Sequence, residues 1–289
     1  RLPMIFILLT VVLDSMGIGL IMPVMPDLIQ SLEGGDLGQA ALWGGVLATI
    51  FAVMQFLFGP TIGSISDRFG RRPVLLIALV VMSFDYVLMA VAGTIWLLVI
   101  GRIIGGITAA TQSTASAYMA DISKPEDKAA NFGLIGAAFG IGFVIGPMLG
   151  GILAEYGTRA PFWAAAVLAG ANGIFGYFAL PETVTDRIRR PFDIKRANPL
   201  GAFKSITQLP DLGRFMIISF VISLAFFVYP SVWAYFGKLQ FGWGPGMIGL
   251  SLGAFGIGIA IVQGLLMRPI LNKIGERNAV VLGLSVDVL

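Results

Sequence analysis

The chain of 289 residues is 57% hydrophobic and only 12% charged, with a mean hydropathy of +0.89. Soluble domains contain about 45–50% apolar and about 25% charged residues, so this composition indicates a membrane protein. The absence of cysteine excludes disulfides and thiol chemistry. The absence of histidine leaves carboxylates as the proton carriers near neutral pH. The net charge of +3 does not indicate nucleic-acid binding, because the basic residues gather in a few loops.

Apolar runs of about 20 residues, long enough to cross a bilayer, follow one another along the chain. The first run is not a signal peptide, since it contains Asp14 and no small-residue cleavage site follows it. We therefore predict an all-α membrane protein in which a ninth helix begins near residue 278. The complete helices are expected at 3–29, 41–65, 73–93, 95–119, 131–155, 159–180, 212–237 and 245–270.

A short basic turn at 63–73 gives the chain its orientation. Four charges fall within six residues there, and most other loop cations, including those of 181–214, lie on the same side of the predicted membrane. The opposite loops offer only Arg159 and Lys238. By the positive-inside rule the crowded side is cytoplasmic, and so is the N-terminus.

The helices divide into two groups. Residues 1–180 are predicted to form a six-helix bundle, 181–211 a cytoplasmic linker, and 212–289 a partial second bundle. A weak internal repeat supports this division: Phe69-Gly-Arg-Arg72 recurs as Ile274-Gly-Glu-Arg277, at an offset of 205 residues. A complete repeat would extend beyond Leu289, and the chain begins at Arg1 and not at Met, so we expect about nine of twelve helices here.

Three acids fall well inside predicted spans, away from the span ends: Asp14, Asp85 and Asp287. A carboxylate at the bilayer centre costs about 2.5–3.5 kcal/mol or more, so each is expected to face a cavity, to have a partner or to be protonated. A proton or cation-substrate site is the functional interpretation. The alternatives are backbone contacts at a break near Gly17 and Gly19 for Asp14, a packing hydrogen bond for Asp85, and a frayed helix end for Asp287.

Other polar residues also lie inside apolar runs. Arg102 is the one basic residue well within a span, and it should pair with an acid or with helix carbonyls, or hold the fourth helix to the first. Three glutamines are candidates for substrate hydrogen bonds, or for helix–helix contacts worth about 0.6 kcal/mol each. They are Gln55, Gln112 and Gln263.

The basic turn is also a candidate gate. Asp67 and Arg71 would share one face if the turn were helical, and Asp121 ends the fourth helix on the same side. Arg68 and Arg72 are interpreted as anchors to anionic lipid, worth about 1 kcal/mol each.

The fifth helix carries small residues at a spacing that allows backbones to approach closely. Proline inside this run removes a backbone donor and is expected to kink the helix. Tight packing and a functional bend are both compatible with the pattern. The residues are Gly142, Gly146, Pro147, Gly150 and Gly151.

These motifs resemble those of the major facilitator superfamily. The pattern Gly63-x-x-x-Asp67-Arg68-x-Gly70-Arg71-Arg72 resembles the signature between its second and third helices, and Arg102-x-x-x-Gly106 its second motif. The glycine run at 142–151 is similar to the motif of its drug/H⁺ antiporter branch. Further segments are similar to the tetracycline/H⁺ antiporter family: Leu13–Pro23, Asp85-Tyr86, Ala120-Asp121-Ile122 and Ala254–Ile257.

This resemblance implies a proton-coupled drug efflux antiporter in the inner membrane, a transporter and not an enzyme, that works by alternating access as a monomer. Asp14, Asp85 and Asp287 would carry protons or contact a cationic drug, with tetracycline bound to a divalent metal as one candidate. Arg102 would assist Asp14, and the Asp67–Arg71–Asp121 group would latch the outward-open state. No cofactor and no protein-bound metal are implied.

One position departs from the family pattern. Some members carry a histidine after the segment Ala254–Ile257, where this chain has Gly258. A transport step that needs that imidazole cannot operate here, which weakens tetracycline as the cargo more than it weakens proton-driven efflux. Transport of another metabolite and a non-transporting membrane receptor are the alternatives.

Overall fold

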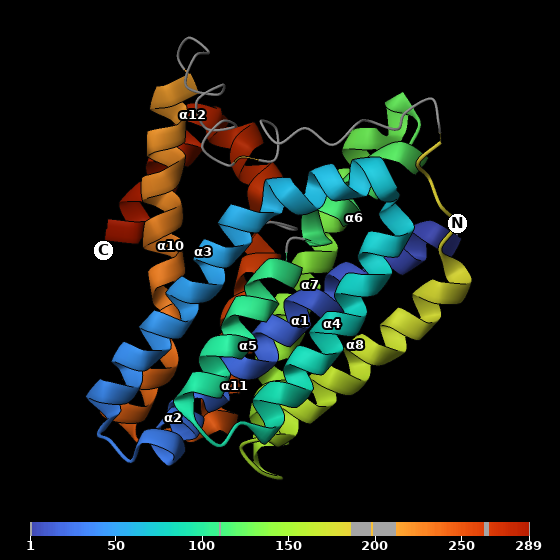
Figure 1. The fold of residues 1–289 in the computed structure, drawn as a ribbon. Helices are drawn as coiled ribbons and strands as arrows, with labels where there is room; N and C mark the ends of the chain where they lie inside the picture. Colours follow the sequence, from blue (N-terminus) through green and yellow to red (C-terminus); the bar gives the residue numbers. More distant parts are fainter. Residues whose placement is uncertain (1, 110, 186–197, 199–211, 263–265, 289) are drawn as a thin grey trace.

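The computed structural model describes residues 2–109, 111–185, 198, 212–262 and 266–288, and these residues form helices joined by short connections (Figure 1). The predicted all-α membrane class is confirmed. The helices are α1 (Leu2–Ile21), η1 (Met22–Val24), α2 (Met25–Glu33), α3 (Leu37–Phe69), α4 (Arg71–Val91), α5 (Ile95–Thr108), α6 (Thr111–Ile122), η2 (Pro125–Asp127), α7 (Lys128–Ala154), α8 (Ala160–Ala179), α10 (Leu212–Phe241), α11 (Pro245–Ile261) and α12 (Met267–Val288).

Within the described residues, seven helical segments are long and apolar enough to cross a membrane, which makes this a multi-pass membrane protein. They correspond to the first seven predicted spans. The eighth predicted span, 245–270, is represented by α11, which is apolar but ends at Ile261 after 17 residues. The boundaries follow the apolar runs closely because lipid-facing backbone must be hydrogen-bonded within its own helix.

Two predicted spans contain more than one helical element. The first passes from α1 through the 3₁₀ turn η1 into α2, and prolines at Pro23 and Pro26 remove the backbone donors there. In the fourth span α5 ends at Thr108 and α6 begins at Thr111, and residue 110 between them lies outside the described residues. The predicted break near Gly17 and Gly19 is wrong, since α1 is helical throughout.

The weak sequence repeat corresponds to a shared backbone conformation. Gly70 has φ 114° and ψ 149°, and Gly275 has φ 75° and ψ 164°. This region is open almost only to glycine. At each place the non-helical glycine separates two helical stretches, so the ninth helix resumes after Gly275, within α12. The division into two bundles remains a prediction, and this match supports it.

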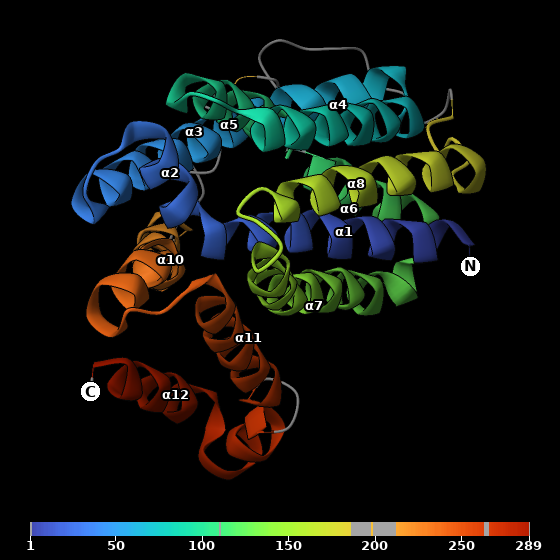
Figure 2. The ribbon, with the colours of Figure 1, turned by 90° about the horizontal axis from the view of Figure 1, so that it is seen from below.

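The small residues of α7 allow it to pack between α1 and α11 (Figure 2). A Cβ atom at Gly146 would lie 2.6 Å from the Met16 carbonyl oxygen, and one at Gly150 would lie 2.2 Å from that of Leu20. On the side towards α11, a Cβ at Gly249 would lie 2.2 Å from the carbonyl oxygen of Pro147. Helix α7 continues past Pro147 to Ala154, and the expected kink remains a prediction.

Gly142 and Gly151 complete these contacts. A Cβ at Gly142 would lie 2.1 Å from the hydroxyl of Ser15, and one at Gly151 would lie 2.6 Å from the carbonyl oxygen of Pro245. The glycine run therefore joins α7 to two helices at once, and it connects α11 to the first eight helices.

Gly150→Ala should destabilise the protein by about 1–3 kcal/mol, because the added methyl group overlaps the α1 backbone. Gly140→Ala on the same helix is the matched control, since its Cβ would meet nothing within 4 Å. Thermal unfolding in detergent, followed by tryptophan fluorescence, measures the difference. Equal unfolding temperatures for the two variants would contradict the close α1–α7 packing.

Candidate functional site

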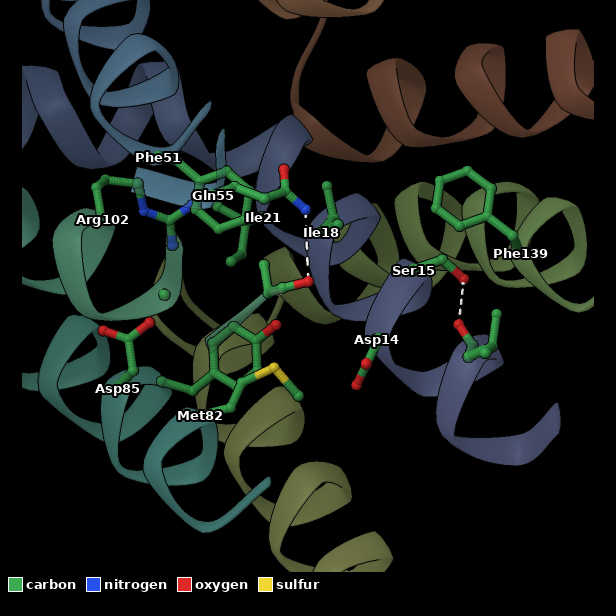
Figure 3. A pocket seen from close by; sticks show the side chains of 14 residues that line it. Asp14, Ser15, Ile18, Ile21, Phe51, Gln55, Met82, Asp85, Arg102 and Phe139 are labelled. Atoms are coloured by element: carbon green, nitrogen blue, oxygen red, sulfur yellow. Dashed lines mark hydrogen bonds between the residues drawn. The ribbon is translucent and has the colours of Figure 1, made fainter. Parts of the chain in front are cut away.

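A small cavity lies among α1, α3, α4, α5 and α7 (Figure 3). Its volume is about 50 Å³. A buried water needs about 10–15 Å³ on this measure, so the space suits a few water molecules. The lining contains six polar side chains: Asp14, Ser15, Gln55, Asp85, Tyr86 and Arg102. The structure thus brings together four predicted site residues, from four separate helices.

Asp85 is held deep in the bundle, with 2% of its surface exposed. Its carboxylate rests on the glycines of α5: a Cβ at Gly101 would lie 3.0 Å from Oδ1, and one at Gly105 would lie 2.8 Å from Oδ2. Oδ1 has no hydrogen-bond partner within the described part of the chain. The alternative of a packing hydrogen bond is therefore not supported for this oxygen.

Arg102 extends from α5 into the same cavity. Its Nη2 donates to the sulfur of Met89 at 2.6 Å, and its guanidinium carbon lies 5.4 Å from the ring centroid of Phe51. Both partners are weak acceptors compared with a carboxylate. The guanidinium thus lines the same cavity as the two acids while its described contacts are to weak acceptors.

Only one of the three glutamines predicted from the sequence has a described side chain. Gln55 lines the cavity, and its Nε2 donates to the carbonyl oxygen of Ala109 at 3.5 Å, where α5 ends (Figure 3). Gln112 lies near the start of α6, but its side chain is outside the described part of the chain. Gln263 lies outside the described residues altogether, and only the backbone of Asp287, in α12, is described. The roles of these last three residues remain predictions.

Tyr86 and Phe51 were not among the candidate site residues predicted from the sequence, although Tyr86 belongs to the Asp85-Tyr86 segment that resembles the family. Tyr86 is 6% exposed and lines the cavity, and a Cβ at Gly17 of α1 would lie 2.3 Å from its hydroxyl oxygen. Phe51 lines the cavity beneath Arg102. Aromatic residues in an apolar helix carry no local signal that distinguishes a cavity from lipid or from core packing.

The three candidate gate residues make contact, with Arg71 lying between Asp67 and Asp121. Arg71 Nη1 donates to Asp67 Oδ1 at 3.0 Å, and Arg71 Nε donates to Asp121 Oδ2. The turn is not continuously helical, because Gly70 interrupts the helix, and the Asp67–Arg71 pair joins α3 to α4. Asp67 and Arg71 therefore fix the angle between two helices.

The remaining residues of the turn have simpler surroundings. Arg68 lies over the exposed ring of Phe69, at 5.1 Å from its centroid. Arg72, predicted as a lipid anchor, donates from Nη2 to the carbonyl oxygen of Tyr177 on α8 at 2.8 Å. Gly63 accepts at its carbonyl oxygen from the hydroxyl of Ser66.

Glu182, which the sequence placed in the linker, caps α4. Its Oε1 accepts from the backbone N–H of Arg71 at 3.0 Å, and its Oε2 accepts from that of Arg72 at 3.2 Å. These are N–H groups that the first turn of a helix leaves without partners. A Cβ at Gly70 would lie 2.3 Å from Oε2, so glycine is needed for this approach as well as for the backbone conformation.

The arrangement of apolar helices around a polar internal cavity is that of a multi-pass membrane transporter. The sequence matches the Major Facilitator Superfamily over residues 7–286. The fold is similar to that of the human organic anion transporter MFSD10 (TETRAN), with a TM-score of 0.72 and 24% identity over 92% of this chain and 71% of that one.

Relatives with higher sequence identity show which family within the superfamily the chain belongs to. The chain is 43% identical to the class C tetracycline resistance protein of Escherichia coli, over 99% of this chain and 72% of that protein. It is 30% identical to multidrug resistance protein 2 of Bacillus subtilis (strain 168), over 96% of this chain and 68% of that protein. The chain belongs to the tetracycline resistance family of the major facilitator superfamily.

Glu182→Ala should lower the free energy of unfolding by about 0.5–2 kcal/mol, the usual cost of losing a helix N-cap. Glu126→Ala, which removes an exposed acid from η2, is the control and should leave stability nearly unchanged. Thermal unfolding of the two purified variants compares them. A loss as large for Glu126→Ala would show that the Glu182 cap makes no specific contribution.

Proposed function

We propose that this protein is a proton-coupled antiporter of the inner membrane that exports tetracycline-type drugs by alternating access. The observation that carries the proposal is the convergence of Asp14 and Asp85, from α1 and α4, on one cavity that also receives Gln55 and Arg102. The names of the relatives support a drug as cargo. The distribution of basic loops supports a cytoplasmic N-terminus.

A carboxylate suits the exchange of protons for drug, because the same group can bind either a proton or a cationic drug. A buried carboxylate oxygen without a hydrogen-bond partner is costly, and either a proton or a cationic ligand satisfies it. Asp85 Oδ1 is such an oxygen. If proton and drug compete for the same carboxylate, entry of one favours release of the other, which is the coupling that an antiporter requires.

Arg102 would take part as a movable counter-charge. Its contacts with Met89 and Phe51 are weak, so the guanidinium can approach a carboxylate once the proton has left. Such an exchange keeps the cavity close to neutral at each stage, which matters because charges interact strongly where water is scarce.

The size of the cavity is consistent with alternating access. A space of about 50 Å³ holds water but not a drug-sized molecule, whose pockets are about 300–1,000 Å³. The helices must therefore part before a drug can enter. We interpret the described arrangement as closed to drug around Asp14 and Asp85, with a drug site that forms when the two bundles rotate.

Asp85→Asn should abolish drug-driven proton movement in everted membrane vesicles, because an amide side chain neither gains nor loses a proton near neutral pH. Asp127→Asn, at an exposed position next to α7, is the matched control and should retain wild-type flux. Immunoblots confirm equal amounts of protein in the membrane. Full proton-coupled efflux by Asp85→Asn would remove this residue from the proposed site.

A further inference from the structure

A second charged contact lies away from the cavity and joins α2 to α10. Lys238 Nζ donates to Asp27 Oδ1 and, at 2.6 Å, to Oε1 of Gln30. The two charged side chains are 31% and 29% exposed, so water still reaches both. In the sequence, Lys238 stands out only as one of two cations on the predicted non-cytoplasmic side, and no local pattern marks Asp27 or Gln30.

This contact lies at the opposite end of the molecule from the basic turn. Helix α3 begins just after α2 and ends at the basic turn, and its 33 residues span about 50 Å. Figure 1 shows α2 beside one end of α10, at the bottom of the view, far from the junction of α3 and α4. If the basic turn is cytoplasmic, Lys238 and Asp27 lie at the external surface.

The contact also joins the two predicted halves. Asp27 and Gln30 precede the 181–211 connection and Lys238 follows it. By contrast, the described side-chain partners of Arg71 are Ser66, Asp67 and Asp121, all in the first half. Among the described residues, therefore, Lys238 makes a charged link between halves and Arg71 does not.

Close contacts also join α10 to α3 and α11 to α7. Tyr235, one turn before Lys238, reaches α3, where a Cβ at Gly44 would lie 2.0 Å from its hydroxyl oxygen. Helix α11 meets α7 through Gly249 and Gly151, as described above. Close helix contacts thus link the two predicted halves, and the Asp27–Lys238 pair adds a directional, charged contact between them.

We propose that Asp27, Gln30 and Lys238 form an external gate, which holds α2 against α10 while the cavity is closed to the outside and which must separate whenever it opens there. The proposal rests on the alternating access argued above. Partial exposure suits a gate, because an ion pair that water can reach separates at low cost, whereas breaking a buried pair leaves uncompensated charges.

The chain contains no cysteine, so a single introduced thiol can report on the gate without further changes. Ile21→Cys places that thiol in the cavity lining, at the end of α1 that leads towards α2. The measurement is its rate of reaction with a membrane-impermeant maleimide in intact cells and in everted vesicles. No drug is needed, so the result is independent of the Asp85→Asn flux experiment.

In this background, Lys238→Gln and Asp27→Asn should each speed labelling in intact cells about two- to fivefold, the population shift expected when one accessible ion pair is lost. The charge exchange Asp27→Lys with Lys238→Asp should restore a rate near that of the unmodified gate, as should Lys238→Arg. Glu33→Gln is the control, since it removes the same charge from an exposed position on α2 and should have no effect.

Unchanged labelling in both single variants would overturn the proposal, as would faster labelling confined to everted vesicles. So would an equal acceleration by Glu33→Gln, because that would indicate a general effect of charge. If the gate variants behave as expected while Asp85→Asn retains coupled efflux, the gate stands and the proposed proton site fails.

Discussion

The cost of placing a carboxylate inside a bilayer is the constraint from which the rest of this structure follows. Asp14 and Asp85 lie in different membrane-spanning helices, and each would cost about 2.5–3.5 kcal/mol or more if it faced lipid. Bringing both to one cavity with Arg102 and Gln55 lets a little water and a shared counter-charge offset that cost. The result is a single internal site, enclosed by apolar helices, that contains two ionisable carboxylates and one guanidinium.

Glycine determines how closely the groups of this site can approach. Gly101 and Gly105 leave space for the Asp85 carboxylate, and Gly70 leaves space for Glu182. In each case a methyl group would lie within about 3 Å of a carboxylate oxygen, which is closer than real Cβ contacts. In the same way, glycines allow the backbone of α7 to approach the backbones of α1 and α11 closely. Close backbone contact replaces bulky side-chain packing, which is how helices associate where lipid removes the hydrophobic driving force.

The helical membrane fold and the positions of most spans could be predicted from the sequence, because apolar runs and basic loops are local sequence signals. The cost of exposing Asp14, Asp85 and Arg102 to lipid predicted only that each would face a cavity or have a partner, and the link between Arg102 and Asp14 came from the family resemblance. What the sequence did not reveal depends on distant pairs: Glu182 caps a helix that begins 111 residues earlier, and Lys238 contacts Asp27 across 211 residues. Glu182 also lies beside a basic connection, where an acid has no distinguishing pattern.

The central claim is that proton and drug exchange at one internal site. The most direct measurement uses the protein reconstituted in sealed liposomes that contain a pH-sensitive dye, with a drug gradient imposed and no initial pH difference. The account predicts proton flux opposite in direction to drug flux, which stops when the drug gradient is exhausted. Drug movement that leaves the internal pH unchanged, with the liposomes shown to be proton-tight, would contradict it.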